Sequence, residues 1–520
     1  MNVMKFTTII TRTLPLWLVL VFATSCDNML NEPLDNQALQ ENIDYTQTEN
    51  MYAHLVGAYA TFYNLQWETF PLISVRGDDV HAAGDQAPLT DTDEFKYNSS
   101  FWMYNSVWQN LYGDMFTFHG AMEEIDKYKE FAPNPAVAEQ YKAEIRVMRA
   151  FELMQIARLW GSILIPTSSQ SEELYLTPLS TFEEVMQHIS DEMDEVAPLL
   201  PNVRPNQRTD IRGGVTRYTA LAVKALANLE MENYQGVVDA TDEIIGSGLF
   251  SLEDDYYNLF KKPGKLNNER LLELQYSDFG QGSGENRSYL YAFFGPNAWT
   301  PSVSGAGAGW GFWEPTEKYI KFMLDRGENV RLTTNVLFTQ NGIDIIESDP
   351  NYNPVPAYVT NETADGDVIG RTDGQAESRA KFSSGKHYLP STQLTPGRTD
   401  YGTGNNFVCI RYAQILLVHA EAVVMGAASA EMTAAEAVNE VRDRADLAPL
   451  GAVTLDDVLD EKYAELAMEW GTRFEDLVRH NRTTELNDAR RTYQESRRFL
   501  PYPQAQVDIL SQLRDAQTNN

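Results

Sequence analysis

Apolar residues recur at helical spacing along most of the chain, and this pattern predicts helices that pack in pairs. The strongest pair covers residues 136–160 and 181–197. Gly161 follows the first helix and suits a left-handed C-terminal cap. Thr181 and Glu184 have the spacing of a capping box at the start of the second helix. These residues predict two well-bounded helices joined by a short extended segment.

Further helices are predicted from the same pattern, at 52–67, 108–128, 215–231, 234–246, 411–424, 434–445 and 455–479. Small and apolar residues on 215–231 and 234–246 allow close helix packing, as in tetratricopeptide-type repeats. In the last helix, Glu469 and Arg473 are predicted to pair on the surface, four residues apart. The helical pattern therefore predicts a repeat-type scaffold.

A long segment, residues 247–405, interrupts these helical pairs. The sequence predicts a mainly α fold, a tetratricopeptide-like helical-pair scaffold with a large irregular, loop-rich insertion. Residues 46–520 are expected to form a single domain, with the scaffold at 46–246 and 406–520 and a ligand-binding insertion at 247–405. Two independent domains are the less favoured interpretation.

The N-terminus has the features of an export signal. A short positive region precedes the apolar run 14–22, which is too short for a permanent membrane-spanning helix. Small residues then lead directly to Cys26, as in a lipoprotein cleavage site. We therefore predict a signal peptide at 1–25, lipidation of Cys26 and a tether at 26–45; an ordinary secretory signal with a coincidental cysteine is the alternative.

The charge of the chain argues against nucleic acids and anionic membrane surfaces as partners. The formal net charge is -33, and the predicted signal peptide carries two cations (Lys5 and Arg12) and no acid, so the mature chain carries -35. Such an acidic body repels nucleic acid phosphates and anionic membrane surfaces. The other cysteine, Cys409, lies in an apolar context and is expected to be a core residue without a disulfide partner.

Residues 280–315 differ from the scaffold in composition. They contain eight glycines and eight aromatic residues: Tyr289, Tyr291, Phe293, Phe294, Trp299, Trp310, Phe312 and Trp313. Loops that hold flat rings on a rigid scaffold are common binding sites, and aromatic planes stack on the C–H faces of sugars. We favour a glycan site here; the alternative is that the rings pack a small core of their own.

A second candidate segment is residues 76–105. Asp78 offers a carboxylate for sugar hydroxyls, and Trp102 offers a ring. For Asp79 and His81 a structural role in an acidic turn is the better interpretation, and Trp108 and Tyr112, four residues apart, are expected in the core.

Motifs of common enzymes are absent from the sequence. No zinc-protease, serine-hydrolase or phosphate-loop motif occurs, so we predict a protein that is not an enzyme and that has no cofactor and no metal site. A carboxylate pair for glycoside hydrolysis is left open, because 74 acidic residues offer many pairs.

Several short motifs, in order, resemble the SusD/RagB-like family of nutrient-binding outer-membrane lipoproteins. They lie at 143–151, 159–161, 165–166, 218–222, 411–421, 437–445, 465–467, 473–479 and 499–503. The resemblance implies a surface-exposed, lipid-anchored protein of the outer membrane. It also implies a SusC-like TonB-dependent transporter as partner, to which captured glycan is delivered without hydrolysis.

Site residues follow in part from this resemblance. Trp102 and Asn105 fall where the family often has an aromatic and a polar ligand residue, and Asp78 lies in the comparable early loop. From composition we add four aromatic residues of the insertion: Tyr291, Trp299, Trp310 and Trp313. The alternative functions are a surface glycoside hydrolase and a repeat-type protein-binding adaptor.

Overall fold

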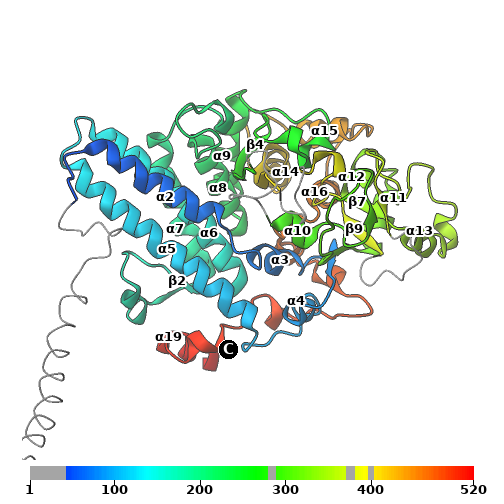
Figure 1. Cartoon of the computed structure of the whole chain (residues 1–520), viewed down its shortest axis with the longest axis horizontal. Helices are drawn as coiled ribbons and strands as arrows, with labels where there is room; N and C mark the ends of the chain where they lie inside the picture. The colour runs from blue at the N-terminus through cyan, green and yellow to red at the C-terminus, as the bar shows by residue number, and fades with distance from the viewer. Residues whose placement is uncertain (1–42, 279–288, 371–380, 396–402, 520) are drawn as a thin grey trace, which may run out of the picture. The chain divides into compact units, whose positions relative to one another are not determined.

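The structure is a computed structural model that describes residues 43–278, 289–370, 381–395 and 403–519, and helices dominate it (Figure 1). The prediction of a mainly α fold is confirmed. Residues 51–520 form one compact unit, and residues 1–50 form another, of which only 43–50 are described. The predicted signal peptide and Cys26 lie outside the described residues. Within the described part of the chain, no helix has both the length and the apolar character needed to cross a membrane.

The first part of the scaffold is a series of helices, each packed against the next. Its helices are α2 (Met51–Tyr63), α5 (Trp102–Lys129), α6 (Pro135–Trp160), α7 (Phe182–Val196), α8 (Arg217–Glu230) and α9 (Tyr234–Gly246). The predicted capping box at Thr181 and Glu184 is present, and Gly161 ends α6 with a φ of 73°. Trp108 and Tyr112 are buried and stacked, with ring centroids 4.6 Å apart, as predicted. These helices follow from local sequence signals.

The scaffold continues more than 150 residues later in the chain, after the segment that follows α9. Helix α9 packs against α14 (Tyr412–Val424), which contacts α15 (Ala434–Arg444) and α16 (Leu455–Leu466). Helices α17 (Thr472–Arg479), α18 (Gln504–Val507) and α19 (Ser511–Asn519) follow. Cys409, just before α14, is a buried free thiol.

The predicted helix 455–479 is wrong, because the chain breaks between α16 and α17. Met468, Trp470 and Gly471 have positive φ values of 63°, 43° and 69°. The Trp470 ring packs edge-on against Phe151, at 5.3 Å, and an added Cβ at Gly471 would lie 2.6 Å from the Ile73 carbonyl oxygen. Burial of the Trp470 ring and this close backbone approach accompany the break.

The predicted surface pair between Glu469 and Arg473 is also wrong. Glu469 accepts hydrogen bonds from Arg411 and Lys386, whereas Arg473 donates to Asp78. Arg473 is buried, and Glu469 is largely so. Both residues therefore stabilise long-range contacts rather than the surface of one helix.

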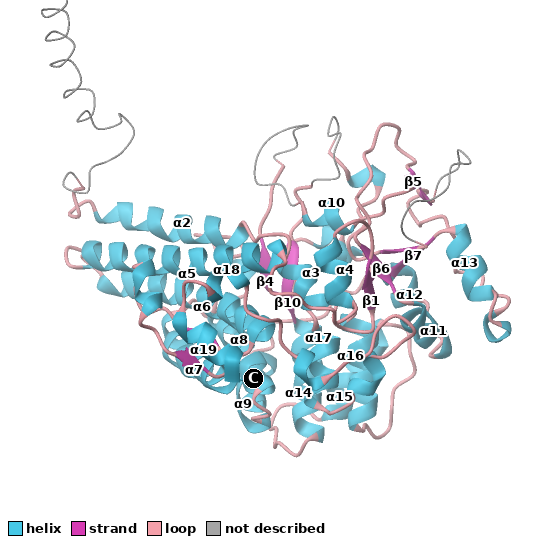
Figure 2. Cartoon of the chain, turned by 90° about the horizontal axis from the view of Figure 1, so that it is seen from below, coloured by secondary structure: helices cyan, strands magenta, loops and turns pink. Residues whose placement is uncertain are grey.

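The segment between α9 and α14 holds short strands and helices. These are β4 (Arg270–Leu274), α10 (Leu290–Phe294), β5 (Trp299–Thr300), β6 (Trp313–Pro315), α11 (Glu317–Asp325), α12 (Val330–Asn335), β7 (Val336–Phe338), α13 (Gln340–Glu347), β8 (Val368–Ile369), β9 (Phe382–Ser384) and β10 (Phe407–Arg411). Antiparallel pairs join β4 to β10, β5 to β8 and β7 to β9. Helices α11–α13 and β7 lie on the opposite side of the compact unit from α2, α5 and α6 (Figure 2).

Three short elements link the N-terminal part of the compact unit to this segment. They are α3 (Thr69–Ser74), β1 (Val80–Ala82) and α4 (Ala87–Asp93), and β1 pairs antiparallel with β6. A further two-stranded pair, β2 (Ile163–Leu164) with β3 (Leu179–Ser180), connects α6 to α7. Chain segments far apart in the sequence are thus joined by very short strands.

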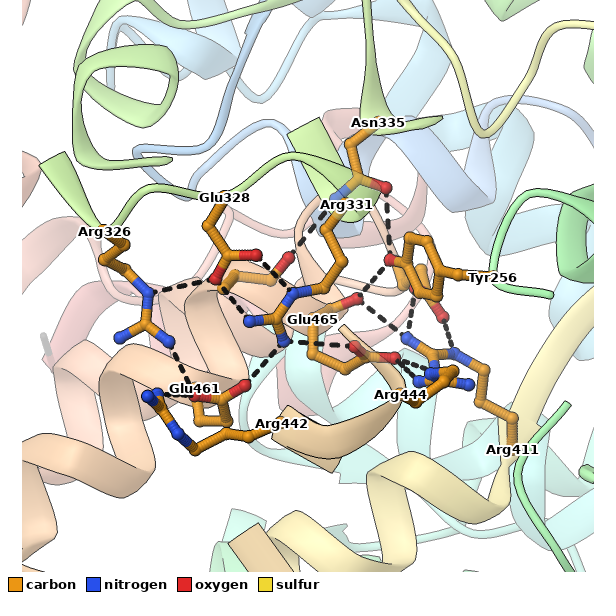
Figure 3. Close-up of polar contacts among 12 residues, drawn as sticks. Tyr256, Arg326, Glu328, Arg331, Asn335, Arg411, Arg442, Arg444, Glu461 and Glu465 are labelled. Atoms are coloured by element: carbon orange, nitrogen blue, oxygen red, sulfur yellow. Dashed lines mark hydrogen bonds and ion pairs between the residues drawn. The ribbon is translucent and has the colours of Figure 1, made fainter. Parts of the chain in front are cut away.

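A buried network of ion pairs fixes α12 against the C-terminal helices (Figure 3). Arg331, fully buried, donates to Glu461 at 2.6 Å, to Glu465 at 3.3 Å and to Glu328. Arg444 also pairs with Glu465. Because each buried charge has opposite charges beside it, the network satisfies groups that would otherwise be costly to bury.

Candidate functional site

The glycine- and aromatic-rich segment separates its rings into a buried group and an exposed group. In the described part, 289–315, the buried rings are Tyr291, Phe294, Trp299, Phe312 and Trp313. Trp310 and Tyr289 are exposed, and Phe293 is partly exposed. The expectation that all these rings form one ligand site is therefore too broad. Most of the described rings are buried, as expected from the alternative in which they pack a small core.

Glycines set this separation by allowing close backbone contacts. Gly309 donates its N–H to the Pro296 carbonyl at 2.8 Å, and an added Cβ there would lie 2.6 Å from the Gly295 carbonyl oxygen. Gly311 has a φ of 62°, in the left-handed region that favours glycine. Between them, Trp310 donates its N–H to the Ala292 carbonyl at 2.6 Å. The turn leaves Trp310 exposed while Phe312 is buried.

Trp67, Phe293 and Trp310 form an exposed surface that we call the aromatic platform. The Trp67 and Phe293 rings stack with centroids 4.3 Å apart and an angle of 16°. The Trp310 ring stands edge-on to Phe293, at 4.9 Å and 87°, and is 50% exposed. Phe312 is buried beside all three rings. Such a supported indole offers a fixed flat face to the C–H groups of a ligand.

Sequence reasoning missed Trp67 as a site residue. The prediction placed it at the end of a helix over 52–67, but α2 ends at Tyr63 and leaves Trp67 in the following turn. Its partner Phe293 lies more than 220 residues away in the chain. The helical pattern of the sequence runs through Trp67, so it gave no signal that separates this residue from the helix.

Three predicted ligand residues of the insertion are structural instead. Trp313 has no exposed surface and packs on Phe70, with ring centroids 4.8 Å apart. Tyr291 is 3% exposed and donates its hydroxyl to the Asn406 carbonyl at 3.1 Å. Trp299 is 9% exposed. These rings lack the exposed face that a glycan contact requires, so we remove them from the candidate site.

Strand pairing brings the two candidate segments of the sequence together. In the β1–β6 pair, Ala82 lies opposite Trp313, and His81 lies opposite Glu314. Side chains alternate between the faces of a strand, so His81 and Glu314 lie on the face away from Trp313. They line a charged cleft of about 360 Å³, whose wall also includes Asp78.

Asp78 holds the fold together at the base of this cleft. It is 3% exposed, and it accepts hydrogen bonds from Arg473 at 2.8 Å and from Lys318. Burial favours a raised pKa, but these two cations hold the pKa of Asp78 below its usual value. Its neighbour Asp79 accepts from the Met468 N–H, and burial raises the pKa of Asp79 to about 6. Asp78 therefore lines the cleft with its charge paired to Arg473 and Lys318, and its role as a ligand residue stays a prediction.

Trp102 and Asn105 lie at the start of α5. Trp102 is 51% exposed. Asn105 donates to the Gln109 side chain at 3.1 Å and accepts from the Gln506 side chain at 2.9 Å. Trp102 stays a candidate ligand residue on grounds of exposure, whereas the Asn105 side chain already has partners on α5 and α18.

Comparison of the sequence with known proteins finds similarity to SusD-like proteins. Residues 268–499 match the model of the SusD family. The chain is 24% identical over 422 residues to SusD-like protein P38 from Formosa agariphila, covering 73% of each protein. It is 22% identical over 481 residues to a SusD-like protein from Bacteroides ovatus, covering 88% of this chain and 80% of that one.

Solved structures show the same architecture. Surface glycan-binding protein A from Bacteroides thetaiotaomicron, in complex with laminarihexaose, matches with a TM-score of 0.69 and 21% identity, over 88% of this chain and 97% of that chain. A laminarin-binding SusD-like protein matches with a TM-score of 0.71 and 21% identity, over 89% and 97%. The fold is thus that of SusD-like surface proteins. The resemblance to the SusD/RagB-like family that the sequence motifs indicated is confirmed.

Proposed function

We propose that this protein captures glycans at the cell surface on its aromatic platform. In this proposal it is anchored in the outer membrane through a lipid on Cys26 and passes uncleaved oligo- or polysaccharide to a SusC-like TonB-dependent transporter. The observation that carries the proposal is the half-exposed Trp310 ring, which stands edge-on to Phe293, itself stacked on Trp67.

The platform has the physical properties that capture of a sugar ring needs. The Trp310 ring stands edge-on to both Phe293 and Phe312, which restricts its rotamers, so little side-chain entropy is lost on binding. The net charge of -33 favours neutral glycans over acidic ones. Two structural neighbours are named for laminarin or laminarihexaose, so β-glucans are the first ligands to test.

Calorimetry of the purified protein with laminarihexaose, cellohexaose and maltohexaose tests the proposal. Replacement of Trp310 by alanine is expected to weaken binding of the recognised glycan about tenfold, because an aromatic contact contributes about 0.5–1.5 kcal/mol beyond its buried area. Tyr175→Ala is the matched control, since Tyr175 is an exposed ring (55%) outside the platform. Equal affinity of the two variants would contradict the platform assignment.

Chromatography of the ligand after incubation separates capture from hydrolysis. We expect intact oligosaccharide after prolonged incubation. Shortened products would favour the surface glycoside hydrolase over the binding protein. Failure of every saccharide in a wider panel to bind would contradict the glycan function, while leaving the fold unaffected.

A further inference from the structure

A second cavity, of about 420 Å³, lies between α12, β7 and the loop 358–369. This volume is in the range of about 300–1,000 Å³ typical of ligand sites. None of the three platform residues lines it. The β5–β8 pair, in which Ile369 of the cavity lies opposite Trp299, and the Ser302 N–H bond to Asp367 join it to the glycine-rich segment. The cavity is therefore a separate candidate site.

Its lining combines an apolar floor with a rim of hydroxyl, amide and carboxylate groups. The floor is Val336, Leu337, Phe338 and Ile369. The rim carries Tyr257, Asn329, Thr333, Tyr358, Thr360, Thr363, Asp255 and Glu362. The described residues of the lining include no lysine or arginine. Such a lining suits neutral hydroxyl groups and disfavours anions such as phosphate, sulfate or uronate.

Buried hydrogen bonds hold one wall of the cavity in place. The Thr363 hydroxyl lies 3.0 Å from the Tyr388 hydroxyl, which donates to Asp367 at 2.6 Å. Asp367 also accepts N–H bonds from Ser302 at 2.7 Å and Ser391 at 2.8 Å. Burial favours a raised pKa, but these bonds hold the pKa of Asp367 below its usual value. An ionised, fully bonded Asp367 makes this wall rigid.

The opposite wall is tied to the buried ion network. Asn335, at the end of α12, accepts a hydrogen bond from the Tyr256 hydroxyl at 3.1 Å, next to Tyr257 of the cavity (Figure 3). Arg331, also on α12, is held by three glutamates. The cavity is thus preformed. On its rim, the half-buried Tyr358 hydroxyl has no hydrogen-bond partner among the described residues.

We propose that this cavity is a second binding site for a neutral sugar unit, independent of the aromatic platform. The Tyr358 ring provides a surface for the C–H face of the sugar, and its hydroxyl, with Asn329 and Glu362, provides hydrogen-bond partners for the sugar hydroxyls. This inference rests on the proposed glycan-binding function and assigns it a second location.

The test uses calorimetry with the hexasaccharide that binds best, comparing four variants with the unaltered protein. Tyr358→Ala removes the ring, and Ala364→Trp fills the cavity from an exposed position. Tyr352→Ala is the matched control, because Tyr352 is a half-buried tyrosine six residues away that does not line the cavity. Trp310→Ala removes the platform. Thermal unfolding of each variant confirms that it is folded.

We expect two ligands per chain in the unaltered protein and in Tyr352→Ala. In Tyr358→Ala, Ala364→Trp and Trp310→Ala, one site is expected to keep its affinity and the other to weaken about tenfold or more. In the Trp310→Ala background, glucose is expected to bind at least tenfold more tightly than glucuronic acid. If the unaltered protein binds one ligand per chain and only Trp310→Ala removes it, the second site is overturned and the proposed function stays intact. A single ligand that only the two cavity variants remove would support the cavity and overturn the platform. Binding of no saccharide at all would overturn both.

Discussion

Helices α6–α9 of the scaffold and the segment 247–405 are held in place by different interactions. In the scaffold, apolar residues at helical spacing are buried between neighbouring helices and a capping box starts α7, while buried ion pairs such as Arg158–Glu230 supplement this apolar packing. In the segment 247–405, short elements depend on buried ion pairs and on backbone contacts with distant parts of the chain. Single residues should therefore matter more in the second region than in the first.

The largest effect is expected from Arg331→Met in the ion network. This change leaves Glu328, Glu461 and Glu465 without their shared buried cation. Removal of one partner from a buried ion pair costs about 3–5 kcal/mol, so urea denaturation should show a loss of that size.

Arg217→Met is the matched control on the scaffold. Arg217 pairs with Glu243 at the surface, where the two side chains are 35% and 48% exposed. Exposed ion pairs contribute about 0–1 kcal/mol. Similar losses in the two arginine variants would contradict the distinction between the regions.

The same distinction explains which parts of the molecule could be predicted from sequence. The capping box at Thr181 depends on neighbouring residues and was predicted. Gly161 has the positive φ of the predicted left-handed cap, but its ψ of -100° lies outside that region. The partners of Glu469 are Arg411, 58 residues away, and Lys386, 83 residues away, whereas the spacing of the sequence pointed to Arg473. The opposite exposures of Trp310 and Trp313 likewise depend on distant contacts, so composition located the segment but could not select the exposed ring.

Gly309→Ala tests the backbone contact that sets the exposure of Trp310. The new Cβ would lie 2.6 Å from the Gly295 carbonyl oxygen, so the backbone has to shift. Overpacking of this kind costs about 1–3 kcal/mol, and displacement of Trp310 should also weaken glycan binding. Gly57→Ala, in α2, meets no atom within 4 Å and should not lower the free energy of unfolding. Unchanged glycan affinity in Gly309→Ala would show that this contact does not position the platform.

A buried carboxyl pair makes the scaffold sensitive to pH. Asp114 of α5 and Glu152 of α6 interact, and neither Glu152 carboxyl oxygen has a hydrogen-bond partner in the described structure. Burial raises the pKa of Asp114 to about 7, and burial together with Asp114 raises the pKa of Glu152 well above its usual value. The folded chain therefore binds more protons than the unfolded chain between about pH 4 and pH 7, so stability falls as pH rises through this window.

Glu152→Met should reduce this loss of stability, since it removes the buried carboxyl at similar side-chain volume. An unsatisfied buried polar group costs about 1–3 kcal/mol, so we expect a gain of that order at pH 8 and a smaller gain at pH 5. Urea denaturation at the two pH values measures it. Equal gains at pH 5 and pH 8 would show that relief of charge burial is not the cause.

The smallest effect is expected at the capping box of α7. Thr181 accepts the Glu184 N–H at 3.2 Å, and Glu184 accepts the Thr181 N–H at 2.8 Å. Thr181→Ala removes one of these two bonds at an exposed helix end, and loss of an N-cap side chain costs about 1 kcal/mol. Thr117→Ala is the control, because Thr117 is exposed within α5 and bonds only to its own helix, at the Gly113 carbonyl. The free energy of unfolding from urea denaturation should be lower for Thr181→Ala than for Thr117→Ala by about that amount. A loss of several kcal/mol in Thr181→Ala would contradict the comparison of the two regions. It would mean that the scaffold also depends on single residues, since the apolar contacts of α7 with α6 and α8 would not compensate for a lost cap.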